Sequence, residues 1–251
     1  MSNIYLLLDQ FRDYYFDENL HKYSYLGQPV KTSVTQFIES FYQPFDKDYW
    51  SRRKAVQRGI TQEEILAEWQ RKADISARTG TQFHSFMENS LASKNTPKHH
   101  FPEDQQEEIF TRYELLKPLG QKFLFDSRNT LVPIKSEIVI GYQDKIAGQI
   151  DQLFYNKSSQ ELEVWDWKTN KEILTQNKYR KKMLNEFSFL DDCNYNHYSL
   201  QLNIYKNILI RYGFNIGRCY FVWFNENNDN YRCFECLDLQ SQVQTILDRL
   251  R

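Results

Sequence analysis

The sequence has few cysteines, prolines and glycines, and almost no net charge. Four cysteines in 251 residues are too few for a disulfide framework, so we expect reduced thiols. Six prolines and eight glycines, against 18 phenylalanines, 17 tyrosines and 5 tryptophans, argue against long disordered or low-complexity tracts. A formal charge of −1 removes bulk basicity as an argument for a nucleic-acid or membrane partner. Any such argument must therefore be local.

Long hydrophobic runs are also missing near the start of the chain. The longest one there, residues 4–8, is closed by Asp9 and is far shorter than the roughly 20 residues that cross a bilayer. We therefore expect a soluble, intracellular protein with no membrane partner. The length fits one domain with a sizeable core.

The first half of the chain is expected to be helical after an initial hairpin. Aromatic and polar residues alternate around turn formers between residues 14 and 27, which predicts a hairpin that forms a lid or an edge. Ser33 with Gln36, and Thr61 with Glu64, have capping-box spacing and predict helix starts just after Ser33 and Thr61. Apolar stripes then predict two consecutive helices separated by a break over residues 78–81, and a further helix after residue 102.

The second half changes to a period of two, which is typical of strands. The segments that alternate or are rich in strand formers are residues 123–125, 131–140, 146–155, 162–168, 218–224 and 231–239, with helices over 198–212 and 243–250. This order predicts an α/β (α+β) fold with a central mixed sheet flanked by helices. We treat residues 1–251 as a single domain, with a mainly helical part (1–120) and a sheet core (121–251).

The sheet region carries the clearest chemistry. Asp166 and Lys168 are two residues apart on a predicted strand and share a face, while Trp165 and Trp167 point to the other side. If the strand that contains Asp151 pairs alongside, a second carboxylate joins them and favours a hard cation such as Mg²⁺. The alternative is an exposed surface pair, but the flanking tryptophans indicate an interior strand.

Two helical positions could add to this group. His84, with Glu88 one turn later on the same face, could ligate a metal or hydrogen-bond a phosphate, although a helix histidine is more often a packed or capping residue. Gln201 and Tyr205 share a face of a later helix, where they could hydrogen-bond a lysine or a phosphate. By itself the second pair says little.

Taken in order, four motifs resemble a known family. Gly80-Thr81-x-x-His84, Gly148-x-x-Asp151, Asp166-x-Lys168 and Gln201-x-x-x-Tyr205 resemble the RecB-like branch of the PD-(D/E)xK nuclease superfamily. The hairpin and the helix start after Ser33 are also similar to small exonucleases of this branch, such as the phage exonucleases and the mitochondrial genome maintenance exonuclease. The resemblance covers most of the chain and implies a core like that of restriction endonucleases.

The resemblance also implies roles for single residues. His84, Asp151, Asp166 and the Trp167 carbonyl would bind Mg²⁺ or Mn²⁺, and Lys168 would position or activate the attacking water. Gln201 and Tyr205 would orient Lys168 or the DNA strand. Glu137 occupies the place of a further acid in many members, although an exposed strand glutamate is an equal alternative, and Glu88 is a second candidate for that place.

One branch of the family carries an iron–sulfur cluster on four cysteines, one of them before the histidine motif. Here no cysteine precedes His84, and Cys233 and Cys236 would point to opposite faces of a strand. We therefore do not expect a cluster and interpret the cysteines as small apolar residues.

A local basic segment points to a phosphate-bearing partner. It precedes the helix of Gln201 and comprises Lys171, Lys178, Arg180, Lys181 and Lys182, with the aromatic Tyr198 nearby. A solvated face is the alternative, but aromatic neighbours suit stacking of unpaired bases. The sequence and the resemblance together predict a metal-dependent DNA exonuclease that acts on single-stranded DNA or DNA ends in replication, recombination or repair. A nuclease-fold binding module without turnover and an RNA-cleaving nuclease remain the alternatives; the intact Asp151, Asp166 and Lys168 argue against the first.

Overall fold

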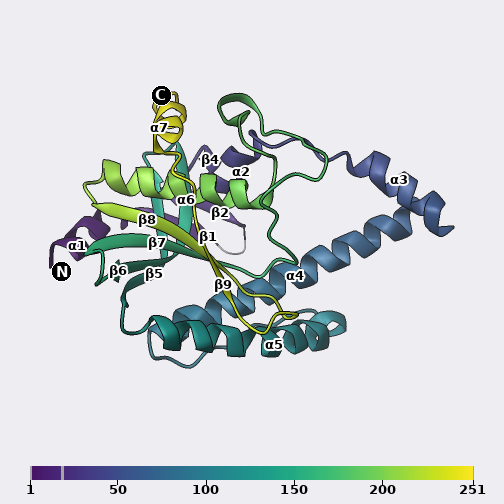
Figure 1. Cartoon of the computed structure of the whole chain (residues 1–251), viewed down its shortest axis with the longest axis horizontal. Coiled ribbons are helices and arrows are strands. Elements are labelled where there is room, and N and C mark those ends of the chain that lie inside the picture. The colour runs from purple at the N-terminus through teal and green to yellow at the C-terminus, as the bar shows by residue number, and fades with distance from the viewer. Residues whose placement is uncertain (1, 18–19, 251) are drawn as a thin grey trace.

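A computed structural model describes residues 2–17 and 20–250 of the chain. Its centre is a six-stranded mixed sheet (Figure 1) with the order β4-β6-β7-β8-β9, to which β5 adds by pairing with β6. The strands are β4 (Thr32–Ser33), β5 (Leu131–Tyr142), β6 (Ile146–Asn156), β7 (Glu161–Lys168), β8 (Ile216–Trp223) and β9 (Arg232–Glu235). The β4–β6 and β7–β8 pairs are parallel and the other pairs are antiparallel. The predicted mixed sheet is thus confirmed.

Helices cover both faces of this sheet. They are α1 (Ser2–Leu8), α2 (Val34–Glu39), α3 (Lys47–Arg58), α4 (Gln62–Leu91), α5 (Glu103–Ser127), α6 (Asn194–Arg211) and α7 (Gln240–Asp248), with short 3-10 turns at Asp9–Phe11 and Asn185–Phe187. Figure 1 shows α6 and α7 on one side of the sheet and α4 and α5 on the other. The α+β class with flanking helices is therefore confirmed.

Each face has its own hydrophobic core, and β7 contributes to both. Val164 packs in the core under α6, whereas Trp165 and Trp167 pack against α4 and α5. This alternation follows from the two-residue period of a strand. It leaves Asp166 and Lys168 on the face opposite the two tryptophans, as the sequence predicts.

The two capping boxes form as predicted, at Ser33 with Gln36 and at Thr61 with Glu64. The predicted break over residues 78–81 is wrong, because α4 is one continuous helix. A glycine inside a helix costs only about 1 kcal/mol relative to alanine, and the buried stripe continues through Ile75, Phe83 and Met87. Gly80 instead lies close to the end of β7, where an added Cβ would be 3.4 Å from the Thr169 hydroxyl.

The strand expected over residues 123–125 is also wrong. These residues belong to the last turns of α5, which runs on through Pro118 to Ser127. Phe123 is buried one helical turn after Leu119, while Phe125 is 62% exposed. Three alternating residues cannot distinguish a strand from a helix, and the longer helical stripe decides the outcome. The last predicted strand, 231–239, is shorter than expected, at Arg232–Glu235.

The N-terminal hairpin is confirmed as part of a separate small sheet. β1 (Tyr14–Asp17), β2 (Lys22–Tyr25) and β3 (Gln28–Pro29) form an antiparallel meander, while turn residues 18 and 19 lie outside the described part of the chain. Tyr14 fastens this sheet to β5, because its ring lies where a side chain at Gly141 would be and its hydroxyl donates to the Gln143 carbonyl at 3.0 Å.

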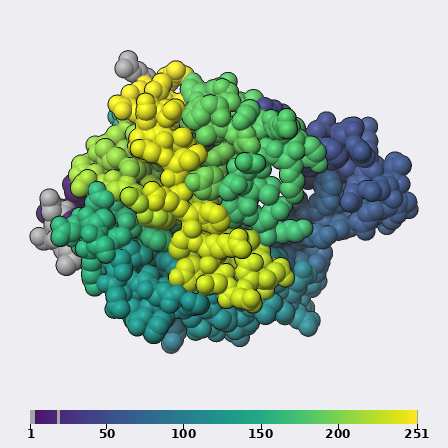
Figure 2. All heavy atoms as spheres, in the orientation of Figure 1, coloured from purple at the N-terminus to yellow at the C-terminus, as the bar shows by residue number. Residues whose placement is uncertain are grey.

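The outline of the molecule is uneven. In Figure 2, α3 and the first half of α4 project from the body as an arm. Among the described residues, no helix combines the length and the apolar character that spanning a membrane requires.

Candidate metal centre and active site

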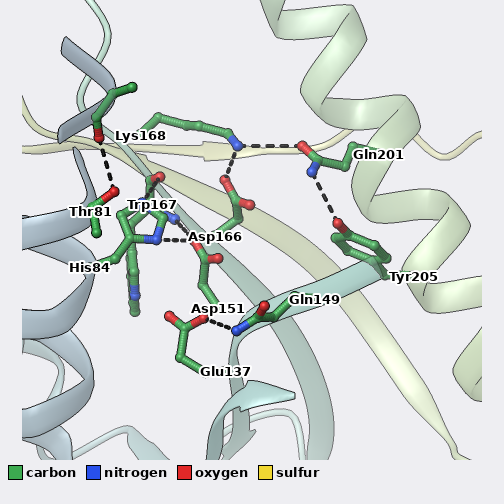
Figure 3. Close-up of polar contacts among 11 residues, drawn as sticks. Thr81, His84, Glu137, Gln149, Asp151, Asp166, Trp167, Lys168, Gln201 and Tyr205 are labelled. Atoms are coloured by element: carbon green, nitrogen blue, oxygen red, sulfur yellow. Dashed lines mark hydrogen bonds and ion pairs between the residues drawn. The ribbon is translucent and has the colours of Figure 1, made fainter. Parts of the chain in front are cut away.

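The polar residues of the second half meet where β6 and β7 separate. The β6–β7 pairing ends at Gln152 and Trp165, and beyond this point β7 continues beside β8. Asp151 on β6 and Asp166 on β7 are the first residues beyond this last pair, and they are only 8% and 4% exposed. Figure 3 shows both carboxylates in this fork, with His84 of α4 beside Asp151 and Lys168 beside Asp166.

Three side chains from three elements form a group that could hold a metal ion. Ligand atoms of His84 on α4, Glu137 on β5 and Asp151 on β6 all lie within 4.8 Å of one another. Two carboxylates with one imidazole suit Mg²⁺ or Mn²⁺, because hard cations prefer oxygen and Mn²⁺ also accepts nitrogen. The group is assembled by tertiary structure, since its members are far apart in sequence.

The backbone of Trp167 holds two members of this group in place. Its N–H donates to Asp151 Oδ2 at 2.7 Å, and its carbonyl lies 3.0 Å from His84 Nε2. Because a carbonyl can only accept, Nε2 carries the proton of that hydrogen bond. His84 Nδ1, which is 3.5 Å from Asp151 Oδ2, then offers a lone pair for a metal whenever the ring is neutral.

Glu137 enters the group through an unusual backbone. It lies opposite Asp151, between the paired residues Ser136–Gln152 and Ile138–Ile150, and its φ of 47° is in the left-handed region. A non-glycine residue there is strained, and such strain is found preferentially at functional sites. Its Oε2 accepts a hydrogen bond of 2.5 Å from Gln149 Nε2, which fixes the carboxylate toward the group (Figure 3).

Three residues in and around this group have raised pKa values, which favours the binding of a cation. Burial, and then the negative charge of Asp151, raise the pKa of Glu137 to about 8. Burial, and then the same charge, raise the pKa of Asp166 to about 6. For His84, burial by itself would lower the pKa, but the charge and hydrogen bond of Asp151, with the charges of Glu137 and Asp166, together raise the pKa to about 9. A bound cation would replace the protons that this cluster otherwise retains.

A second polar chain begins at Asp166. Lys168 Nζ lies 2.6 Å from Asp166 Oδ2 and donates to Gln201 Oε1 at 3.4 Å, while Gln201 Nε2 donates to the Tyr205 hydroxyl at 3.1 Å (Figure 3). The ammonium also lies 4.5 Å from the centre of the Tyr198 ring. Gln201 thus contacts Lys168, and Tyr205 contacts Gln201, both from α6. Their role in orienting Lys168 or the DNA strand stays a prediction.

Gly148 explains how α6 comes close enough for these contacts. A Cβ at this position would be 2.7 Å from Tyr205 Cε1 and 3.0 Å from Val34 Cγ2. The glycine of the Gly-x-x-Asp motif therefore makes room for Tyr205, the last residue of the polar chain. Two motifs that are separate in the sequence are in direct contact here.

The structure brings only some of the predicted metal ligands into one group. His84 and Asp151 meet Glu137, which the sequence left undecided, whereas Asp166 is paired with Lys168 and the Trp167 carbonyl is bonded to His84. The metal-binding roles of Asp166 and Trp167 stay predictions. Glu88 is half-buried near Glu137, whose pKa its charge raises further, but it is outside the 4.8 Å group.

The basic segment lies between β7 and α6. Lys171, Lys178, Arg180, Lys181 and Lys182 are all exposed there. Lys182 is partly neutralised by Asp191, 2.6 Å away. Tyr198 is half-buried, and its ring makes a cation–π contact with the Lys168 ammonium.

The four cysteines are free thiols, of which Cys193 and Cys219 are buried. Burial raises the pKa of Cys219 to about 12, as expected for a small apolar residue in a core.

Two features of the site escaped the sequence analysis. Gln149, which orients Glu137, sits inside the Gly-x-x-Asp motif but carries no distinguishing pattern of its own. A cavity of about 800 Å³ also adjoins the candidate metal centre and is lined in part by Tyr15 and Phe16 of β1. Their alternation predicted a hairpin that forms a lid or an edge, but not that Tyr15 and Phe16 line a cavity beside this group.

No protein-family model matches this chain, and no curated protein matches it.

Proposed function

We propose that this chain is a metal-dependent deoxyribonuclease of the PD-(D/E)xK superfamily, of the RecB-like branch, with a core like that of restriction endonucleases. It would hydrolyse phosphodiester bonds as an exonuclease on single-stranded DNA or DNA ends, in replication, recombination or repair. One observation carries the proposal: a His84, Glu137 and Asp151 group lies beside a buried Asp166–Lys168 pair. Acidic ligands next to a lysine suit attack by water on a phosphodiester.

The donor set fits a divalent metal. His84 Nδ1 and the carboxylates of Glu137 and Asp151 would hold it, and the pKa of Glu137, raised by burial and then by the charge of Asp151, supports a place for a further cation. Mg²⁺ or Mn²⁺ would supply the Lewis acid that polarises a phosphate oxygen and acidifies a bound water. Gln149 and the Trp167 backbone would hold the ligands in their orientation.

Lys168 would act on the phosphate and on the nucleophile. Burial alone would lower the pKa of Lys168, but the charges of Asp166, Tyr198 and Asp151 and the hydrogen bond to Asp166 together raise it, so the ammonium stays charged at neutral pH. A fixed positive charge stabilises the negative charge that develops on a phosphate under attack. Gln201, Tyr205 and the Tyr198 ring would keep the ammonium in place, which lowers the cost of reorganisation.

The substrate class follows from charge and exposure. The exposed lysines and arginine of the basic segment begin directly after the β7 strand that carries Lys168, so they could bind a phosphate backbone as it approaches. Two exposed aromatic side chains between β7 and α6, Tyr179 and Phe189, favour unpaired bases over a closed duplex.

The test is an assay of end-labelled single-stranded DNA, double-stranded DNA and RNA with Mg²⁺, Mn²⁺ or EDTA. We expect metal-dependent shortening of DNA from an end, with single strands preferred, and no cleavage in EDTA. Cleavage of RNA alone would favour the RNA-cleaving alternative. Binding of DNA without cleavage in either metal would favour the binding module.

The matched variants are Asp151→Asn and Asp229→Asn. Asp151 is in the proposed metal group, whereas Asp229 is an exposed loop residue outside it. Loss of one carboxylate ligand should abolish metal-dependent cleavage and weaken metal binding measured by calorimetry, while Asp229→Asn behaves as the wild type. Full turnover by Asp151→Asn would contradict the site assignment.

A further inference from the structure

A cavity of about 800 Å³ opens directly beside the proposed metal centre. One wall is α4, with Gly80, Thr81, His84 and Glu88, and another is formed by Glu137 and Gln149 of the large sheet. The third wall comes from the small N-terminal sheet. Because His84 and Glu137 belong to both the cavity and the metal group, anything bound in the cavity lies next to that group.

The wall from the small sheet is aromatic. Tyr15, Phe16 and His21 line it, and the Tyr15 side chain is 65% exposed. The Phe16 ring is held by Tyr23, whose centroid is 4.6 Å away, and by the edge-on His21 ring at 5.1 Å. Phe16 is half-buried and held in place, whereas Tyr15 is exposed; an aromatic ring held in place makes a low-entropy surface for a flat ligand.

The charges of the lining residues favour the binding of a neutral ring over the binding of a phosphate. None of the described lining residues is a lysine or arginine, whereas Glu88 and Glu137 are acidic. The charged imidazole of His84 is already paired with Asp151, so it offers a phosphate little attraction. Thr81, Ser85 and Gln149 add hydroxyl and amide groups that can hydrogen-bond the edge of a base.

We propose that this cavity binds one unpaired nucleobase of a DNA single strand, stacked on Tyr15 or Phe16, while the adjoining phosphate faces the metal centre. The inference rests on the proposed nuclease function and assigns its specificity to the small sheet. A paired base cannot present its face to a side chain, so a duplex must fray before its end enters the cavity.

The test uses an oligonucleotide with 2-aminopurine near its end, whose fluorescence falls when the base stacks. Binding is measured in Ca²⁺, and cleavage in Mg²⁺ or Mn²⁺. The variants are Tyr15→Leu, Phe16→Leu and the double substitution, with Phe125→Leu as the matched control. Phe125 is 62% exposed, similar to Tyr15, but lies on α5 outside the cavity.

We expect the wild type and Phe125→Leu to quench the probe. The double variant should lose the quenching and bind the single strand roughly 5- to 150-fold more weakly, as expected for one stacked base. Its KM should rise while kcat changes little. Thermal melting checks folding, and Tyr15→Leu by itself keeps the test valid if Phe16 proves necessary for folding, since Tyr15 is mostly exposed.

The outcomes separate the two proposals. If the wild type cleaves DNA and the variants bind and quench as it does, the base site is wrong and the nuclease function stands. If the wild type quenches the probe, the variants lose quenching and no metal supports cleavage, the nuclease function is wrong and the base site stands. A wild type that cleaves DNA without quenching the probe would also overturn the base site.

Discussion

Asp166 and Lys168 are two opposite charges held side by side in the interior of a sheet. Their side chains are only 5% and 17% exposed, and their charged atoms are 2.6 Å apart. Burying either charge without a partner would cost several kcal/mol, so each requires the other. The arrangement adds little net stability compared with apolar residues of equal volume. What the pair provides is a charged ammonium fixed beside the group of His84, Glu137 and Asp151.

We predict that Lys168→Ala lowers kcat by about 10²–10³-fold, as expected for loss of one preorganised electrostatic group. DNA binding in Ca²⁺ should change little, because one lysine among many contributes little to ground-state attraction. Lys168→Arg should not restore kcat, since the guanidinium is planar and larger. Single-turnover cleavage and equilibrium binding measure the two effects separately. A Lys168→Ala enzyme of wild-type rate would remove this residue from the mechanism.

The contact of α6 with β6 links two sequence motifs and depends on the missing side chain at Gly148. Tyr205 fills the space over this glycine and, through Gln201, reaches Lys168. The position of the helix therefore sets the position of the ammonium. A small change in the packing of α6 against β6 should therefore move the Lys168 ammonium.

Gly148→Ala tests this coupling. The new methyl group would meet Tyr205 and Val34 at 2.7–3.0 Å, so we expect a loss of about 1–3 kcal/mol in the free energy of unfolding and a lower kcat. Gly80→Ala is the control for stability, because it lies in a helix and its Cβ would have one contact, at 3.4 Å. It should be neutral or stabilising. Urea denaturation measures both, and a Gly148→Ala protein as stable as the wild type would refute the packing argument.

Glu137, Asp166 and His84 have raised pKa values in the folded chain, so the stability of the whole molecule depends on pH. The pKa of Glu137 is raised to about 8, that of Asp166 to about 6 and that of His84 to about 9, against ordinary values of 4.5, 3.8 and 6.5. In each case the folded chain retains a proton that the unfolded chain has released. The stabilisation is therefore complete below the ordinary pKa and is lost as the pH rises through the folded one.

We predict that the metal-free protein loses thermal stability as the pH rises from about 5 to 9. Mg²⁺ or Mn²⁺ should raise the melting temperature, and more so at high pH, because the ligands must be deprotonated to bind. Glu137→Gln should flatten the pH dependence in EDTA and reduce the stabilisation by metal. Scanning calorimetry in EDTA and in excess metal measures both. A melting temperature in EDTA that rises steadily over this range would contradict the charge assignment.

Much of the fold follows from local patterns. The capping boxes at Ser33 and Thr61 and the alternation along β7 depend on residues within a few positions of one another, so the sequence alone predicts them. The same alternation places Asp166 and Lys168 on one face. The expected break in α4 fails because a continuous buried stripe outweighs a single glycine, and the strand expected over residues 123–125 fails because three residues carry too little periodicity.

The sequence by itself determined the mixed α/β composition, the strands β5 to β8 and the residue types of the candidate site. Tertiary structure decided how they meet. The β5–β6 register and the positive φ of Glu137 bring that glutamate to Asp151, and the Trp167 carbonyl holds His84, 83 positions away in the chain. Local patterns encode contacts between near neighbours, whereas these contacts depend on strand register and helix packing, which only the folded chain as a whole determines.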